Sequence, residues 1–254
     1  MLDVPSDQDV FSVFLIFVRI GAALMLMPGF SEPYIFSRSR LLFAMLMSVV
    51  LAAPVMPHLP ELPQRMDQLV LLVGGETLIG LFIGAATRIM FATLHVAGST
   101  IAAQSGLATA SVFDPNQSTQ GTLPGNFLTT VALVLLFVTD GHHMLLRGIV
   151  ESYTHLRADA PIPIGDMAAF ITDIVQKGFD LGIQMAAPLL LVGLLTNLAM
   201  GVLNRLMPSF QVFFIALPLQ LLLSFATLML SFAAGLLVFF GFLETEYSTL
   251  TVGG

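Results

Sequence analysis

Long apolar stretches separated by short polar segments run through the whole chain of 254 residues. A helix rises about 1.5 Å per residue, so about 20 apolar residues are needed to cross a hydrocarbon core of about 30 Å. The stretches are of this order of length and are spread along the chain, which predicts an all-α integral membrane protein with about six hydrophobic segments. These segments cover Val10–Phe30, Leu41–Met56, Leu69–Ala86, Leu123–Thr139, Leu181–Leu203 and Phe210–Leu243.

The lengths of the segments are irregular, which argues against a uniform bundle of spanning helices. Leu41–Met56 is short, whereas Phe210–Leu243 would extend roughly 50 Å as one straight helix. Proline removes a backbone hydrogen bond and clashes with the preceding turn, so we expect the last run to break or to form a hairpin near Pro218. Gly235 and Gly241 are further weak points in that run.

Two polar regions interrupt a chain that we interpret as a single membrane domain, residues 1–254. The first is a loop at about residues 111–126, in which Asp114-Pro115 favours a turn. Its amides and hydroxyls cannot face lipid, so it is either a solvated connector or a pore or gate element. The second is a polar segment at about residues 140–180.

Composition excludes several classes of protein. Hydrophobic residues make up 56% of the chain and charged residues only 10%, far from the ~25% charged residues of a soluble domain. The net charge of −7 gives no basic footprint for nucleic acid. Cysteine is absent, which excludes disulfides and thiolate chemistry, and no known catalytic or cofactor-binding motif is present, so the residues give no support for an enzyme or for a cofactor.

Small residues recur every four positions in three segments. Residues four apart lie on one face of a helix, and small side chains there let two helical backbones approach closely. We therefore predict three helix-packing stripes. They are Glu76, Gly80, Gly84 and Arg88; Gly98, Ala102, Gly106 and Ala110; and Gly193, Asn197, Gly201 and Arg205.

Arg19 and Glu76 are ionisable residues inside apolar segments, where charge is costly. One interpretation is a buried ion pair that fixes packing. The other is a proton or ion relay that also uses Asp114 and Asp140. The relay would make the protein a stand-alone secondary transporter or proton channel, an alternative that Pro218 in a broken helix also favours.

The sequence Asp140-Gly141-His142-His143 offers metal-ligand side chains, yet we expect no metal site there. Adjacent residues project about 100° apart on a helix, so the two histidines do not share a face. We interpret the cluster as the polar end of the preceding helix, with Gly141 as its cap.

The order of several short motifs resembles the FliR family of the flagellar type III export apparatus and its injectisome relatives. The resemblance runs nearly end to end, and its most specific part is the block from Asn197 to Pro218. In that block Pro208-Ser209 departs from the usual Pro-Gln of the family. The motifs are Pro28 and Pro33 followed by Arg38 and Arg40; Gly75-Glu76 with Gly80 and Gly84; Gln104-Ser105-Gly106 before Asp114-Pro115; Asp140-Gly141-His142; Asn197 to Pro208; and Val212-Phe213 with Pro218-Leu219.

The resemblance implies a non-enzymatic, structural and gating subunit of a hetero-oligomeric helical export gate. Such a gate would contain FliP-like and FliQ-like subunits, with an FlhB-like subunit around it, and would pass unfolded flagellar proteins through the bacterial cytoplasmic membrane at the flagellar basal body. Membrane lipid would be its environment. The plug-like loop of the family corresponds to about residues 106–122, with Gly106, Phe113, Asp114, Pro115, Asn116, Gln117 and Gly121 as candidate gate residues. The candidate assembly and packing residues are Arg19, Glu76, Gly80, Gly84, Arg88, Asn197, Gly201, Arg205, Pro208 and Pro218.

Overall fold

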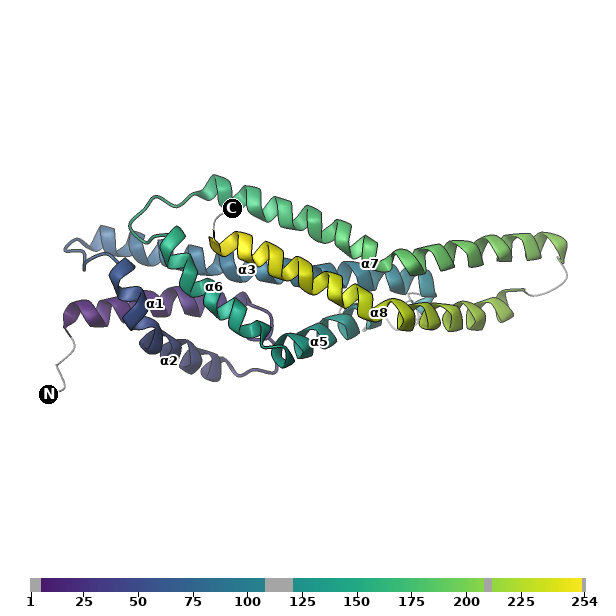
Figure 1. The fold of residues 1–254 in the computed structure, drawn as a ribbon, viewed down its shortest axis with the longest axis horizontal. Helices are drawn as coiled ribbons and strands as arrows, with labels where there is room; N and C mark the ends of the chain where they lie inside the picture. The colour runs from purple at the N-terminus through teal and green to yellow at the C-terminus, as the bar shows by residue number, and fades with distance from the viewer. Residues whose placement is uncertain (1–5, 108–120, 208–211, 253–254) are drawn as a thin grey trace. The chain divides into compact units, whose positions relative to one another are not determined.

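The described part of the chain, residues 6–107, 121–207 and 212–252 of a computed structural model, contains helices and no strand (Figure 1). This confirms the all-α prediction. The helices are α1 (Asp7–Leu26), α2 (Ser37–Val55), the short 3₁₀ helix η1 (Met56–His58), α3 (Met66–Ser105), α5 (Leu123–Val138), α6 (Gly141–His155), α7 (Ile164–Leu206) and α8 (Val212–Val252).

Five of these helices are long and apolar enough to cross a membrane. The pair α5 and α6 passes the same test when taken together, although the two helices are bent by 77° at the break between them. The count of about six apolar segments is therefore confirmed when α5 and α6 are counted together as one bent segment. We conclude that the protein is an integral membrane protein.

Three helices are much longer than a crossing of the hydrocarbon core requires. α3 has 40 residues, α7 has 43 and α8 has 41, so each would extend about 60 Å against a hydrocarbon core of about 30 Å. The expected break near Pro218 is wrong, because α8 continues through it. A single proline removes one backbone hydrogen bond, and the neighbouring bonds of a long helix can keep the helix intact.

Local sequence explains where several helices begin and end. Ser6 and Asp9 form a reciprocal capping box at the start of α1: the backbone N–H of Ser6 donates to Asp9 Oδ2 at 2.8 Å, and the backbone N–H of Asp9 donates to Ser6 Oγ at 3.2 Å. α3 ends before Gly106, whose φ of 78° is a left-handed conformation that glycine adopts easily. α5 begins at Leu123, where the predicted apolar segment Leu123–Thr139 also begins, so residues 123–126 belong to this helix.

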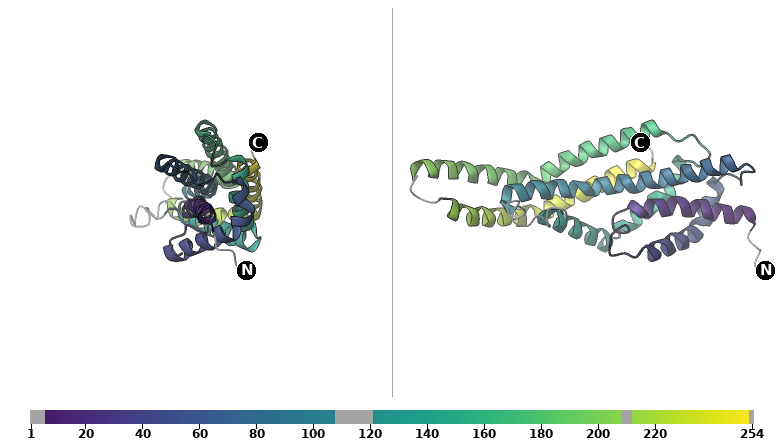
Figure 2. Two further views of the ribbon diagram at one scale, coloured as in Figure 1. Left: turned by 90° about the vertical axis from the view of Figure 1, so that its left-hand side faces the viewer. Right: turned by 180° about the vertical axis from the view of Figure 1, so that it is seen from behind.

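The chain divides into two compact units. The first comprises residues 1–90, 135–174 and 244–254, and the second comprises residues 91–134 and 175–243. In the first unit α1 and α2 lie side by side (Figures 1 and 2). Its core is formed by large, fully buried side chains, among them Leu15, Ile20, Ile83, Leu145 and Tyr153.

The polar segment at about residues 140–180 is mostly helical. It contains all of α6 and the first turns of α7. Tyr247 of α8 is fully buried and donates a hydrogen bond to the backbone oxygen of Leu145 at 2.5 Å, so the end of α8 is fastened to α6 within the first unit. Burying a tyrosine hydroxyl without such an acceptor would be costly.

Candidate functional site

A buried ion pair lies at the centre of the first unit. Arg19 of α1 and Glu76 of α3 both have side chains with 0% exposure. Arg19 donates from Nε to Glu76 Oε2 at 2.6 Å and from Nη2 to Oε1 at 2.8 Å. This two-pronged geometry is the strong form of an arginine–carboxylate contact. The structure therefore joins the two intramembrane charges that the sequence singled out.

The remaining contacts of the Arg19 guanidinium reach α6. Nη1 donates to Ser152 Oγ at 3.0 Å, and Nη2 donates to the backbone oxygen of Leu156 at 2.8 Å. The ring of Tyr153 lies 3.8 Å from Arg19 Cζ, at which distance a cation is attracted to the ring face. Arg19 thus connects α1, α3 and α6, three helices that are far apart in the sequence.

The first small-residue stripe brings α3 against α1. A Cβ atom placed on Gly80 would collide with the backbone oxygen of Arg19 and with Ala22, and one on Gly84 would collide with the backbone oxygen of Ala23. At the end of the stripe Arg88 donates to Ser31 Oγ at 3.2 Å. The backbones of the two helices are therefore in direct contact along the stripe, next to the buried ion pair.

The second stripe brings α3 against α5 within the second unit. A Cβ atom on Gly98 would collide with the backbone of Gly125. Ala102 is 3% exposed and lies on the same face. Gly106 ends α3 and lies just beyond the helix, whereas Ala110 is outside the described residues.

The third stripe is buried only at its beginning. Gly193 of α7 lies against the side chain of Gln104. Asn197, Gly201 and Arg205 are exposed, and Gly201 has open space around its Cα. The apolar side chains between them are also exposed, with Leu195 at 66%, Leu198 at 59%, Val202 at 58% and Leu206 at 71%. This part of α7 therefore has an apolar surface that also carries an amide and a guanidinium.

The candidate gate loop can be located only by its ends. Phe113, Asp114, Pro115, Asn116 and Gln117 lie outside the described residues, as does Pro208 of the assembly set. The described end residues Gly106 and Gly121 both have positive φ, 78° and 83°. Pro218 is exposed on α8.

An apolar groove of about 610 Å³ lies where α3 ends and α5 begins, within the second unit. Its lining includes Leu107, the last described residue before the loop, and Leu123 and Phe127 of α5. Close to the groove residue Ser105, Gln220 of α8 donates to the backbone oxygen of Gln104 at 2.6 Å. The Gln220 hydrogen bond thus satisfies a carbonyl in the last turn of α3, where carbonyl groups generally have no partner within the helix.

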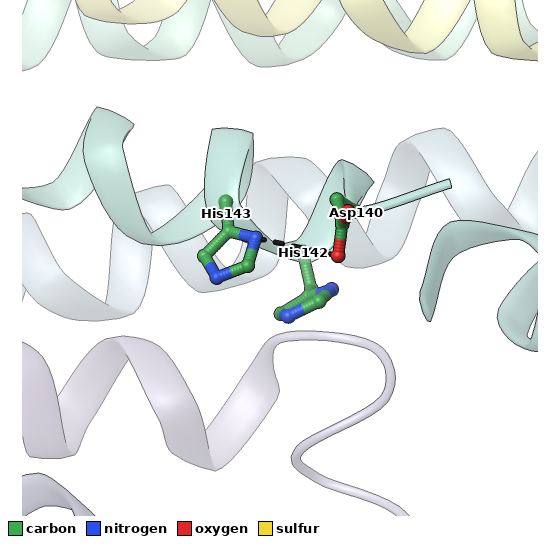
Figure 3. Close-up of side chains that lie close together, drawn as sticks. All are labelled: Asp140, His142 and His143. Carbon is green, nitrogen blue, oxygen red and sulfur yellow. Dashed lines mark ion pairs between the residues drawn. The ribbon is translucent and has the colours of Figure 1, made fainter. Parts of the chain in front are cut away.

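Asp140, His142 and His143 gather at the start of α6 (Figure 3). Their possible ligand atoms all lie within 4.8 Å of one another. The sequence predicts that the two histidines point apart, and for their ring nitrogens this prediction is wrong. Their Cα–Cβ bonds do project about 100° apart around the helix, but the side-chain torsions bring the two rings close together. Asp140, not Gly141, has the left-handed backbone at this bend, with a φ of 58°.

Comparison with known proteins identifies the family. Residues 10–245 match the family described as bacterial export proteins, family 1. The chain belongs to this family. The expected resemblance to FliR is thereby confirmed, and the chain is an export protein rather than an enzyme.

Several relatives of this export protein are named flagellar biosynthetic protein FliR. The protein from Caulobacter vibrioides is 38% identical over 223 residues, which cover 88% of this chain and 89% of the relative. The protein from Bacillus subtilis is 33% identical over 227 residues, covering 88% and 87%. The protein from Escherichia coli is 30% identical over 233 residues, covering 87% and 85%.

Three polar side chains that make contacts at the candidate sites of this export protein were not predicted from its sequence: Ser152 and Tyr153, which contact Arg19, and Gln220, which binds the Gln104 carbonyl. Ser152 and Tyr153 lie on a mixed helix and have no feature in the sequence that would single them out. Gln220 could have been found, because it is the one amide in the long uncharged run that follows Gln211. A lone amide in an apolar helix needs a hydrogen-bond partner.

Proposed function

We propose that this protein is a structural and gating subunit of the flagellar protein export gate in the bacterial cytoplasmic membrane. In this proposal it assembles with FliP-like and FliQ-like subunits into a channel, with an FlhB-like subunit around the complex at the flagellar basal body. Unfolded flagellar proteins are the cargo. The observation that carries the proposal is the match to an export family over residues 10–245, with relatives named FliR that are covered almost in full.

The surface of α7 supports assembly with other proteins. Between Leu195 and Leu206 the helix exposes large apolar side chains together with Asn197 and Arg205. Apolar side chains alone would suit lipid, but an amide and a guanidinium in a hydrocarbon environment are costly without partners. Interhelical contacts with a neighbouring subunit would satisfy both kinds of group.

Helix length supports the same conclusion. α3, α7 and α8 would each extend about twice the thickness of a hydrocarbon core. Where such a helix extends beyond the hydrocarbon core, the apolar side chains on that part are left in water in an isolated monomer, with the hydrophobic cost that this carries. Packing against companion helices in a tall assembly removes that surface from water.

The gating role is steric in this proposal. The loop that contains Phe113 to Gln117 occludes the channel, and an entering substrate displaces it without any covalent step. Flexible apolar side chains suit a seal that must open for many sequences and close again. If this is right, deletion of residues 116–122 makes the assembled complex leak ions, measured as conductance in a planar bilayer. A conductance equal to that of the intact complex refutes the gating role.

The buried ion pair gives little support to a stand-alone transporter. Arg19 and Glu76 neutralise each other at 0% exposure and are bonded to helix α6, as expected of a packing contact. A relay needs groups that exchange protons with a pathway, and Asp140 is instead 77% exposed at a helix start.

Native mass spectrometry of the protein purified from its own membrane tests the proposal. A tagged chain recovered in one complex with FliP-like and FliQ-like subunits supports the export gate. Recovery as a stable monomer or homo-oligomer contradicts it and favours the transporter, which proton-flux assays with a Glu76→Gln variant would then examine. The identity of the recovered partners separates a flagellar gate from that of an injectisome.

A further inference from the structure

The start of α6 carries three side chains whose chemistry is that of transition-metal ligands. Asp140, His142 and His143 offer one carboxylate and two imidazoles, and the possible ligand atoms lie within 4.8 Å of one another. His143 Nδ1 is 3.7 Å from Asp140 Oδ1 (Figure 3). The two imidazole rings have centroids 4.1 Å apart.

We propose that Asp140, His142 and His143 bind a divalent transition-metal ion of the Zn²⁺ class. Imidazole nitrogen and carboxylate oxygen bind Zn²⁺ at about 2.0–2.2 Å. In a tetrahedral site the ligand atoms would then be roughly 3.3 Å apart. The observed separations exceed this only by an amount that rotation of the exposed side chains of Asp140 and His143 can close. Three protein ligands leave one position for water.

His142 supplies the observation that distinguishes this cluster from ordinary exposed polar residues. Its Nδ1 atom is buried and has no hydrogen-bond partner among the described residues. Its ring is stacked on Phe137 with centroids 4.9 Å apart, which restricts its orientation. A buried nitrogen with a free lone pair or an unpaired proton is costly, and a water or an ion bound beside it would remove that cost.

The backbone of Asp140 is a second unusual feature at the same place. Its φ of 58° makes it the one non-glycine residue with positive φ among the described residues. Such conformations cost free energy and cluster at functional sites. The side chain makes no capping hydrogen bond to α6, so it remains available as a ligand. The start of a helix carries a partial positive charge that repels cations, and the negative charge of Asp140 offsets it.

Zinc affinity measured on the whole membrane complex tests the proposal. The complex is purified through a tag without histidine, stripped with a chelator, and titrated with Zn²⁺ against a chromophoric competitor. We expect His142→Ala and His143→Ala each to weaken Zn²⁺ binding by at least about 10-fold to 100-fold. Loss of a group that only supports a metal ligand already has an effect of that size, and here a ligand itself is lost. His155→Ala, at the opposite end of α6, is the matched control and should bind as the unmodified protein does.

Asp140→Asn keeps the test decisive if a histidine variant does not assemble. Asparagine tolerates the left-handed backbone but offers a neutral oxygen, so the fold is retained while Zn²⁺ affinity falls. Equal affinity in Asp140→Asn, His142→Ala and the unmodified complex overturns the proposal. So does a loss in His155→Ala as large as that in His142→Ala, because binding would then not be specific to this cluster.

Discussion

Replacing Glu76 with glutamine removes one charge from the buried pair and changes little else. The amide has nearly the same shape as the carboxylate and can still accept a hydrogen bond from Arg19. The guanidinium, however, keeps its positive charge at 0% exposure with no counter-charge at 2.6 Å. The variant therefore isolates the electrostatic part of the contact from its packing.

We expect Glu76→Gln to destabilise the first unit by about 3–5 kcal/mol. That is the range for breaking a buried salt bridge by removing one partner, since the other charge is left without compensation. The complete burial of both side chains places this pair in that class rather than among surface pairs, which contribute about 0–1 kcal/mol. The two remaining hydrogen bonds of Arg19, to Ser152 and to the Leu156 oxygen, and its contact with the Tyr153 ring keep the loss toward the lower end of the range.

Unfolding equilibria in mixed detergent micelles, followed by circular dichroism, measure this loss. The double variant Arg19→Met with Glu76→Gln is the informative comparison, because it removes the orphaned charge. The double variant leaves no uncompensated charge buried, so it should be less destabilised than the sum of the two single variants by several kcal/mol. A loss below about 1 kcal/mol in Glu76→Gln, or additive effects in the double variant, would refute the reasoning.

Three further changes test the contacts of α3, the loop before α7 and the face of α7. Gly80→Ala forces a methyl group into the backbone oxygen of Arg19 and should reduce unfolding stability by about 1–3 kcal/mol, whereas Gly74→Ala, which meets open space on the same helix, should not reduce it. The Arg157 guanidinium donates to Asp159 and lowers the pKa of that carboxyl below its ordinary value near 3.8. The pair is therefore intact above that value and is lost as pH falls through the lower folded-state pKa, and Arg157→Ala should move the Asp159 titration upward in a ¹³C-carboxyl NMR experiment. Arg205→Ala should reduce recovery of companion subunits in pull-downs while Arg157→Ala leaves it unchanged; equal recovery of companions by both variants would contradict an assembly role for Arg205.

The hydropathy pattern predicts which residues are helical but not how far each helix extends. The apolar run that ends at Ala86 continues as α3 through Arg88 and His95 to Ser105. Hydropathy records side chains, whereas a helix is propagated by backbone hydrogen bonds that polar side chains do not interrupt. The same distinction explains Pro218, since one missing N–H does not end a helix whose other bonds are made.

The sequence predicts which side chains contact each other only where the residue type allows few possible partners. A buried charge demands an opposite charge, so the pairing of Arg19 with Glu76 was among the interpretations that the sequence allowed. The involvement of Ser152 was not, because many serines could supply a hydroxyl. The grouping of His142 with His143 depends on side-chain torsions that residue spacing does not determine.

The Arg19–Glu76 pair of the first unit and the polar side chains on the exposed face of α7 in the second unit are arranged differently. In the first unit the polar groups of Arg19 and Glu76 are directed inward, and each is bonded to another helix of the same chain. In the second unit Asn197 and Arg205 are exposed on an apolar helix. Because an unsatisfied polar group in an apolar environment is costly, the first arrangement stabilises the chain itself, and in the proposed assembly a neighbouring subunit satisfies the second. On the proposed function, substitutions in the first unit should lower the stability of the isolated chain, whereas substitutions at Asn197 and Arg205 should leave that stability intact and weaken only the assembly.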